Sequence, residues 1–263
     1  MYPVCGCRNH ASVLEPYFFS GETDFFRCQR CGVVLRCPMP TLAELDRIYA
    51  DLYRSSNIGN GTTNQASGER VLWRYCQYLT RHVVSPGDTV LDFGCGTGHL
   101  VRFLKDKRMD AFGVERSDAA REFAQRHHSL RLCASLEEVA DESADVVTMI
   151  EVVEHLPDPM AELDIIRRKL RRGGRIFVTT PNLRGLRARV EGGNWREASK
   201  KFHVVLFDFS SLRALLHSAG FKRVRRIRFS PVQRKGFAFH IGARALQVTG
   251  LAGTVCLVAE VNK

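Results

Sequence analysis

The chain has 263 residues, with 39 Lys and Arg against 28 Asp and Glu, and a formal net charge of +11 at pH 7. This length accommodates one full α/β core and a small appendage. No apolar run reaches the roughly 18 residues of a membrane helix, and the first residues lack a signal-peptide pattern. The nine cysteines are scattered, which fits a reducing compartment better than a disulfide framework. We therefore expect a soluble cytoplasmic protein without a membrane span.

Four of the five cysteines in the first 40 residues form two close pairs: Cys5, Cys7, Cys28 and Cys31. With Gly32 the second pair reads C-x-x-C-G, in which the glycine lets backbone amides point at thiolate sulfur, and two such pairs complete a tetrahedral zinc site. A redox pair is the rival interpretation of a lone C-x-x-C. Aromatic residues at 17–19 and 25–26 surround the motif in a segment too short for a core of its own, where a structural metal would supply stability. We predict a zinc-ribbon-like segment over residues 1–40.

A helix and a polar segment follow over residues 41–68. Thr41 and Glu44 form a capping-box pattern at the start of residues 41–53, whose apolar positions have helical spacing. Residues 54–68 have almost no apolar content, so they are expected to form either a mobile linker or a lid over a ligand.

The most informative motif is VLDFGCGTG at residues 90–98. A short apolar strand ends in an acid and then breaks into three alternating glycines, which let a ligand lie against bare backbone. A helix is predicted over residues 99–105, so the turn corresponds to the nucleotide-binding end of a doubly wound sheet. A dinucleotide fingerprint needs its third small residue at the position of His99, so the spacing disfavours that cofactor class.

Three further segments continue the α/β pattern. A strand over residues 111–115 ends at Glu115, 17 residues after Gly98, where a carboxylate can accept both ribose hydroxyls of a nucleoside. Residues 144–150 are a nearly continuous apolar run, typical of a buried parallel strand. In residues 170–182 a helix is expected to stop at a glycine pair and a strand at a proline. This βαβ spacing predicts a parallel sheet.

Together these motifs resemble the class I S-adenosylmethionine (SAM)-dependent methyltransferases, the family that includes ubiquinone-biosynthesis O-methyltransferases and sugar and natural-product methyltransferases. The resemblance covers roughly Gly68 to the C-terminus. It implies an α/β fold with a doubly wound, Rossmann-like, seven-stranded sheet over residues 69–263. It also implies that the last strand, residues 254–260, runs antiparallel.

The resemblance implies a donor site made of Asp92, Gly94, Cys95, Gly96, Gly98, Glu115, Arg116, Ser135, Leu136, Ile150 and Glu151. The residues from Asp92 to Gly98 would hold the methionine portion of SAM, and Glu115 the ribose. Ser135 and Leu136 correspond to the adenine position, although the family often has an acid near Ser135 and this chain does not.

The N-terminal cysteines also resemble those of methyltransferases that pair a C-P-x-C-G knuckle with R-C-x-x-C-G. Tyr2 stands where that pattern has its first cysteine, which leaves the fourth zinc ligand open. Cys7 is the first choice and His10 the second, and loss of the metal is the third alternative. With four protein ligands the zinc would be structural, because no coordination position stays open for catalysis.

The segment EVVEH at residues 151–155 admits three interpretations. In the first, Glu151 contacts the donor while Glu154 and His155 only shape the start of a helix. In the second, His155 is a general base. In the third, all three residues ligate a divalent cation such as Mg²⁺ that binds acceptor oxygens. The same E-x-x-E-H pattern occurs in ubiquinone-pathway O-methyltransferases and in small-RNA 2′-O-methyltransferases, where a divalent metal is implied. The RNA enzymes bring a later histidine to the metal, and His203 is the candidate here; core packing is its alternative.

Residues 183–201 lie where this fold inserts its acceptor-recognition elements, so Trp195 either lines an acceptor pocket or packs in the core. His203 precedes a predicted Ser-capped helix that ends at Gly220.

Positive charge is concentrated in the second part of the chain: residues 151–263 hold 22 Lys and Arg against 9 Asp and Glu, and residues 1–150 hold 17 against 19. Such a surface favours an anionic partner, such as an acidic or carrier-bound small molecule or a nucleic acid, or else it is simply solvated. No aromatic-interleaved basic module indicates an RNA-binding domain. We therefore predict a SAM-dependent methyltransferase acting on a small molecule, most readily at a hydroxyl oxygen. An RNA 2′-O-methyltransferase and a catalytically silent SAM-binding protein are the alternatives.

Overall fold

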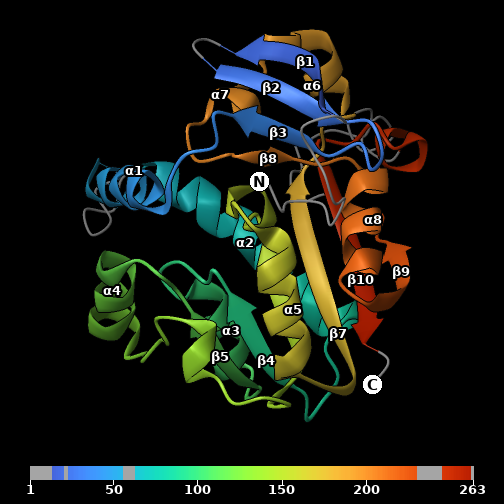
Figure 1. The fold of residues 1–263 in the computed structure, drawn as a ribbon. Helices are drawn as coiled ribbons and strands as arrows, with labels where there is room; N and C mark the ends of the chain where they lie inside the picture. The colour runs from blue at the N-terminus through green and yellow to red at the C-terminus, as the bar shows by residue number, and fades with distance from the viewer. Residues whose placement is uncertain (1–13, 21–22, 56–62, 230–244, 262–263) are drawn as a thin grey trace.

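The computed structural model describes residues 14–20, 23–55, 63–229 and 245–261. Within them the chain forms two sheets, a large mixed one and a small antiparallel one. Figure 1 shows the small sheet beyond the arrowhead of strand β7, at the carboxyl end of the parallel strands.

The large sheet has six strands in the order β5-β4-β6-β7-β10-β9. Their bounds are β4 (Thr89–Phe93), β5 (Asp110–Val114), β6 (Ala144–Ile150), β7 (Leu170–Pro181), β9 (Phe221–Arg226) and β10 (Thr254–Val261). Strands β4 to β7 are parallel, and β10 runs antiparallel to both β7 and β9, as predicted for the last strand. The inner strands β4 and β6 are nearly continuous apolar runs because helices cover both of their faces.

Seven strands were expected, and the described residues form six. At the outer edge of β5 a single parallel bridge joins Val114 and Cys133. The Cys133 amide donates to the Gly113 carbonyl, and the Glu115 amide donates to the Cys133 carbonyl. The chain turns into a 3₁₀-helix at Leu136, so the outer strand is reduced to this bridge.

Helices and 3₁₀-helices accompany the sheets, and residues 245–249 are also helical. Their bounds are α1 (Leu42–Ser55), α2 (Thr63–His82), α3 (His99–Asp106), α4 (Asp118–His128), η2 (Leu136–Glu138), η3 (Val153–His155), α5 (Pro159–Lys169), α6 (Leu186–Glu191), η4 (Gly192–Asn194), α7 (Arg196–Ser199) and α8 (Phe209–Ser218).

The large sheet is covered on both faces, which makes the fold doubly wound. On one face Tyr75 and Leu79 of α2 pack with Leu100 and Leu104 of α3. On the other, apolar side chains of α5 and α8 join a core that extends to Val33 and Leu35 of the N-terminal segment. This three-layer arrangement matches the α/β class that the sequence predicts.

Several predicted helix ends can be compared with the structure. The capping box is present, since the Thr41 amide donates to Glu44 Oε2 (2.7 Å) and the Glu44 amide to Thr41 Oγ1 (3.3 Å). Helix α2 begins at Thr63, so residues 63–68 are helical where a linker or lid was expected, and residues 56–62 lie outside the described part of the chain.

Two other predicted ends were wrong. Helix α5 ends at Lys169, before the glycine pair, because Leu170 already pairs with Ala144 in the sheet. Helix α8 is capped by Asp208, whose side chain accepts from the Ser211 amide, rather than by a serine.

The small sheet joins the N-terminal segment to the rest of the chain. Its strand order is β1-β2-β3-β8, with bounds β1 (Leu14–Ser20), β2 (Thr23–Cys28), β3 (Val34–Cys37) and β8 (Val205–Leu206). Strand β8 follows the long strand β7 in sequence, yet Val34 pairs with Leu206 and Leu35 with Val205. The N-terminal strands therefore complete their sheet with a strand from the large domain.

Among the described residues, no helix is long and apolar enough to cross a membrane.

Candidate active site

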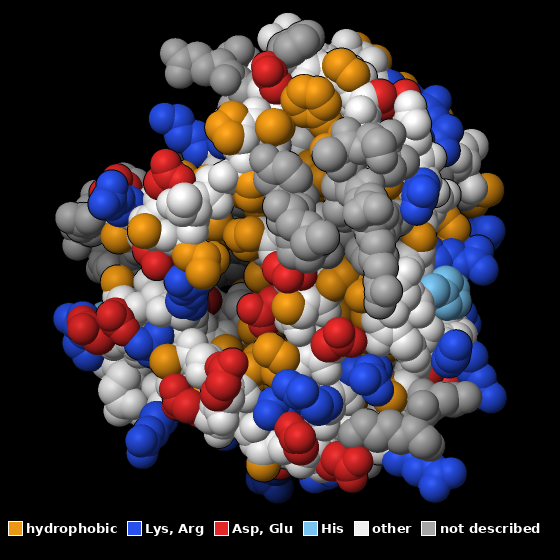
Figure 2. All heavy atoms as spheres, in the orientation of Figure 1, with side chains coloured by type: hydrophobic (Ala, Val, Ile, Leu, Met, Phe, Trp, Pro, Cys, Tyr) orange, Lys and Arg blue, Asp and Glu red, His pale blue; other side chains and the backbone are white. Residues whose placement is uncertain are grey.

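The three glycines of the predicted turn lie at the carboxyl end of β4 and have positive φ: 72° at Gly94, 54° at Gly96 and 80° at Gly98. A Cβ on Gly94 would lie 2.6 Å from Cγ2 of Val152, so the turn packs directly against the segment that follows β6. The bare backbone leaves room for a ligand at this edge of the sheet. Figure 2 shows a hollow on this face of the molecule, between α1 and the start of α5, with acidic side chains at its edge.

Two buried carboxyl groups flank the turn. Asp92 accepts a 2.7 Å hydrogen bond from Thr148 Oγ1, and burial raises its pKa to about 7. Glu115 follows β5 and accepts from the amides of Gly96 (2.9 Å) and Ser117 (2.8 Å). Both carboxyl groups are thus held beside the glycines by hydrogen bonds within the protein.

Other expected donor-site residues have different surroundings. Cys95 packs over Gly113, where a Cβ would come within 2.5 Å of its sulfur, and burial raises the pKa of its thiol. Ile150 ends β6 and packs against the α2–α3 side of the core. These two side chains are therefore in contact with the core beside the turn.

Three further residues were expected near the ribose and adenine, and they follow β5 or lie at the start of η2. Arg116 is exposed and forms a 3.0 Å ion pair with Asp46 of α1. Ser135 precedes η2, and Leu136 is buried in the large core. Leu136 therefore contributes mainly apolar packing, and the adenine contact of Ser135 stays a prediction.

Glu151, the first residue after β6, has a positive φ of 55°. Its amide donates to the Thr179 carbonyl (3.0 Å), and Thr179 Oγ1 donates back to Glu151 Oε1 (3.0 Å). Desolvation, and then the charge of Glu154, raise the pKa of this carboxyl group well above its usual range. Such a backbone conformation is strained for a residue with a side chain and is held by the surrounding contacts.

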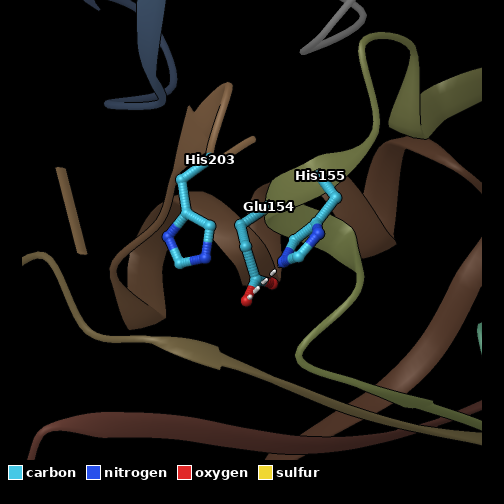
Figure 3. Close-up of side chains that lie close together, drawn as sticks. All are labelled: Glu154, His155 and His203. Atoms are coloured by element: carbon cyan, nitrogen blue, oxygen red, sulfur yellow. Dashed lines mark ion pairs between the residues drawn. The ribbon is translucent and has the colours of Figure 1, made fainter. Parts of the chain in front are cut away.

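Three side chains converge beside the glycine turn: Glu154, His155 and His203, each offering a ligand atom within 4.8 Å of the others. Figure 3 shows them facing one another, with one nitrogen of each ring turned toward Glu154. Nε2 of His155 lies 3.6 Å from Glu154 Oε1. The Val204 amide donates to the Glu154 carbonyl (2.9 Å), and this bond holds the segment before β8 against η3. The structure thus brings His203 to the predicted E-x-x-E-H motif, whereas the Glu151 side chain bonds to Thr179.

The cluster contains buried polar atoms without hydrogen bonds in the described structure. Glu154 is 1% exposed, and its Oε2 accepts from Thr180 Oγ1 (2.9 Å), but its Oε1 has no hydrogen-bond partner. His203 is also 1% exposed, and its Nδ1 lacks a hydrogen bond, with Glu197 Oε2 3.8 Å away. Burial, and then His155, lower the pKa of His203 to about 2, so this ring is neutral. Unsatisfied buried polar atoms cost free energy, which a bound ligand would recover.

The arrangement can perform two kinds of chemistry. Neutral imidazoles and a carboxylate are suitable ligands for a divalent cation. The same imidazole of His155 can instead accept a proton from a hydroxyl group. Both require a free lone pair on Nε2 of His155, the nitrogen that faces Glu154.

Two neighbours of the cluster were not identified from the sequence. Tyr49 belongs to the apolar stripe of α1, and its hydroxyl lies 2.7 Å from Nδ1 of His155. Glu197 lies in α7, where nothing in the local sequence connects it with His203. The aromatic character of position 49 within an amphipathic helix was the only available signal, and it also fits ordinary packing.

Trp195 is 5% exposed and belongs to a small core with Phe25, Leu183 and Leu206, between the N-terminal strands and the α6–α7 segment. Of the two interpretations of this residue, core packing describes its surroundings.

Of the expected zinc ligands, only Cys28 and Cys31 lie in the described residues; Cys5, Cys7 and His10 lie outside them. The Gly32 amide donates to the Cys28 carbonyl (2.8 Å), and Gly32 has a φ of 75°. The C-x-x-C-G segment therefore has the tight glycine turn that the motif predicts.

The methyltransferase-domain family matches residues 69–225. A ubiquinone biosynthesis O-methyltransferase of Idiomarina loihiensis is 36% identical over 106 residues, which cover 36% of this chain and 43% of that protein. The corresponding enzyme of Methylococcus capsulatus is 33% identical over 121 residues, covering 43% of this chain and 51% of that protein. The matches thus span about half of each relative or less.

Solved structures show the same fold. A chain in the complex between the Haloferax volcanii Trm112 methyltransferase activator and a methyltransferase has a TM-score of 0.61 and 21% identity, covering 84% of this chain and 98% of that one. A phosphoethanolamine N-methyltransferase of Haemonchus contortus, solved with S-adenosyl-L-methionine, has a TM-score of 0.55 and 17% identity, covering 88% of this chain and 63% of that one. At these identities the likeness concerns the fold alone.

Proposed function

This chain belongs to the methyltransferase-domain family, the class I SAM-dependent methyltransferases, and we propose that it methylates a hydroxyl oxygen of a small molecule. The observation that carries the proposal is the cluster of Glu154, His155 and His203 beside the glycine turn. The partial matches to ubiquinone biosynthesis O-methyltransferases support oxygen as the acceptor atom.

The donor site fits SAM. The three glycines of the turn have positive φ and carry no side chain, so backbone alone faces the ligand side, and Gly94 packs against Val152. In this proposal Asp92 receives the amino end of the methionine portion, and Glu115 accepts from the ribose hydroxyls in place of its present bond to the Gly96 amide. Bound SAM supplies a methyl group on a positively charged sulfur.

The acceptor hydroxyl attacks the methyl carbon in line with the leaving sulfur. The new C–O bond forms as the C–S bond breaks, which neutralises the sulfur and yields S-adenosylhomocysteine. The hydroxyl proton must leave, and Nε2 of His155 is in a position to take it, with Glu154 Oε1 3.6 Å away to stabilise the resulting imidazolium. Orientation of the acceptor by the cluster is the main contribution of the protein.

The cluster also fits a divalent cation such as Mg²⁺. The unsatisfied Glu154 Oε1 and the neutral ring of His203 are suitable donors, and His155 completes a set of three. A bound cation would lower the pKa of the acceptor hydroxyl. In this proposal Glu151 stays with Thr179 and lines the donor end instead of serving as a ligand.

For residues 1–40 we propose a structural zinc site held by Cys5, Cys7, Cys28 and Cys31. The observed glycine turn from Cys28 to Gly32 supports one half of it. Metal analysis of the purified protein is expected to give about one zinc per chain, and Cys28→Ser to lose it together with thermal stability. Zinc content near zero would contradict this site.

An RNA acceptor is the second candidate, because the cluster includes His203 and residues 151–263 carry an excess of basic side chains. The basic surface equally supports an acidic or carrier-bound small molecule.

The test is transfer of a labelled methyl group from SAM into a host extract that is then fractionated by size, with and without RNase and chelator. Label in the small-molecule fraction is expected; loss on addition of chelator with recovery by Mg²⁺ would indicate the cation, and transfer that survives chelator would indicate His155 as the base. Label that disappears on RNase treatment would replace the small-molecule proposal by the RNA one. No enzyme-dependent label in any fraction would contradict both.

A further inference from the structure

Helix α1 contributes a side chain to the cluster from outside residues 69–225, the part matched by the methyltransferase-domain family. The hydroxyl of Tyr49 lies 2.7 Å from Nδ1 of His155. The two rings are nearly parallel, with centroids 6.0 Å apart and 13° between their planes. Phe202 lies beside both rings, at 6.2 Å from Tyr49 and 5.2 Å from His155. His155 is therefore held by a hydrogen bond and by aromatic contacts.

The direction of this hydrogen bond determines which nitrogen of His155 is available, and the 2.7 Å distance fits either tautomer of the ring. A neutral imidazole carries one N–H, and the other nitrogen has the lone pair. Nδ1 faces Tyr49, so Nε2 faces Glu154, and Figure 3 shows it directed into the cluster. If the proton were on Nε2, the ring could neither accept a proton there nor bind a cation there. If Nδ1 carries the proton and donates it to the Tyr49 oxygen, the Nε2 lone pair is free.

We propose that Tyr49 is a positioning residue that accepts a hydrogen bond from Nδ1–H of His155 and thereby keeps the Nε2 lone pair directed at Glu154 and His203. The inference rests on the proposed function of the cluster, but it holds whether His155 acts as a base or as a metal ligand. Helix α1, which follows the N-terminal strands, then supplies part of the candidate active site.

The position of Tyr49 is fixed by helix α1 itself. The capping box of Thr41 and Glu44 starts the helix, and Leu45 is 2% exposed in the large core. Tyr49 lies one turn after Leu45 on the same face of the helix. Asp46, on the same helix, forms the ion pair with Arg116 just after β5. Helix α1 therefore contacts the acceptor side of the site through Tyr49 and the donor side through Asp46.

The test compares Tyr49→Phe, which keeps the ring and removes the hydroxyl, with Tyr17→Phe as the matched control. Tyr17 is 41% exposed on β1, and its ring contacts Phe18 and Arg27. Nitrogen-15 NMR of the histidine rings, at a pH where His155 is neutral, reports which nitrogen carries the proton. We expect His155 to be protonated on Nδ1 in the wild type and in Tyr17→Phe, and to shift toward Nε2–H in Tyr49→Phe.

Two further measurements accompany the spectra. Binding of Mn²⁺ alone is expected to weaken roughly 10–100-fold in Tyr49→Phe, the usual effect of losing an outer-shell partner of a metal ligand. Affinity for S-adenosylhomocysteine is expected to stay within about twofold, because the hydroxyl does not reach the donor side. A wild-type ring protonated on Nε2, or an unchanged tautomer in Tyr49→Phe, would overturn the inference. Equal losses of Mn²⁺ and S-adenosylhomocysteine affinity would also overturn it by indicating a general structural role.

A failure of the proposed function can be distinguished from a failure of the inference about Tyr49. If His155→Ala retained full methyl transfer, the cluster would have no part in the reaction, while the NMR measurement would still report whether Tyr49 sets the tautomer of His155.

Discussion

The donor side and the acceptor side of the candidate site are built in different ways. On the donor side, Asp92 and Glu115 lie at the ends of two adjacent parallel strands, and their carboxyl groups already accept hydrogen bonds from Thr148, Gly96 and Ser117. On the acceptor side, the cluster joins η3 to the segment before β8 and leaves Glu154 Oε1 without a hydrogen bond. The carboxyl groups of the donor side are therefore held by hydrogen bonds within the protein, whereas Glu154 on the acceptor side keeps one oxygen available to a ligand.

The largest expected effect comes from the acceptor side. Glu154→Gln keeps the size of the side chain and its contact with Thr180, but removes the charge beside His155. Methyl transfer is expected to fall about 100-fold or more, as when an acid–base or metal-binding group is lost. Affinity for S-adenosylhomocysteine is expected to change less than about twofold.

The matched control is Glu122→Gln, the same change in an exposed i,i+4 ion pair with Arg126. It is expected to leave transfer unchanged, because exposed pairs contribute little. Full activity of Glu154→Gln would show that the cluster is only structural.

A change on the donor side is expected to act on SAM instead. In Gly94→Ala the new Cβ would meet Val152 in a backbone conformation with a φ of 72°. Strain on the order of 1–3 kcal/mol is expected, together with roughly tenfold weaker binding of S-adenosylhomocysteine in calorimetry.

Gly173→Ala separates strain from site effects, because Gly173 has a similar φ of 75° but nothing lies within 4 Å of its added Cβ. It is expected to lower thermal stability without changing ligand affinity. Equal affinity losses in the two variants would contradict a specific role of Gly94.

The donor side also predicts a pH dependence. Burial raises the pKa of Asp92 to about 7 in the ligand-free protein, and a ligand amino group would favour the carboxylate. Binding of S-adenosylhomocysteine then releases a proton, so affinity is expected to rise by about tenfold between pH 6 and pH 8. Asp92→Asn is expected to bind more weakly and without this pH dependence. An affinity that falls as the pH rises would contradict this role of Asp92.

The raised pKa of Asp92 also determines the direction in which the free energy of unfolding changes with pH. Because the folded-state pKa of Asp92 is raised above its ordinary value of 3.8, folding retains a proton that the unfolded chain loses. The contribution of Asp92 to the free energy of unfolding is expected to be highest below about pH 4 and to fall as the pH rises to about 7. The change is on the order of a few kcal/mol, since one pKa unit corresponds to about 1.4 kcal/mol. Urea unfolding of the wild type and Asp92→Asn would isolate it.

The smallest effect is expected where helix α1 meets the donor side. Asp46 and Arg116 form a 3.0 Å ion pair, but their side chains are 50% and 60% exposed. Asp46→Asn is expected to change ligand affinity and methyl transfer by no more than about twofold, because water screens such pairs. A tenfold effect would show that the donor side depends on α1 as strongly as the acceptor side is proposed to.

Local sequence signals were sufficient for the elements that carry the donor side. Strand β6 has the predicted bounds, α3 follows the glycine turn, and the Thr41–Glu44 capping box starts α1. Periodicity, turn residues and caps act over a few neighbouring residues, so the sequence shows them directly. Asp92 and Glu115 could also be placed from the sequence, because each acid lies at the end of a strand that the local pattern predicts.

Longer-range features were decided only by the tertiary structure. The pairing of β3 with β8, the strained backbone of Glu151, and the hydrogen bond of Tyr49 to a histidine 106 residues away follow from how distant segments pack together. None of these contacts imposes a pattern on the neighbouring residues, because each side chain alone also suits an ordinary core position. The sequence by itself therefore determined the fold class and the place of the glycine turn with its two acids, and packing decided which side chains join Glu154 and His155 in the cluster.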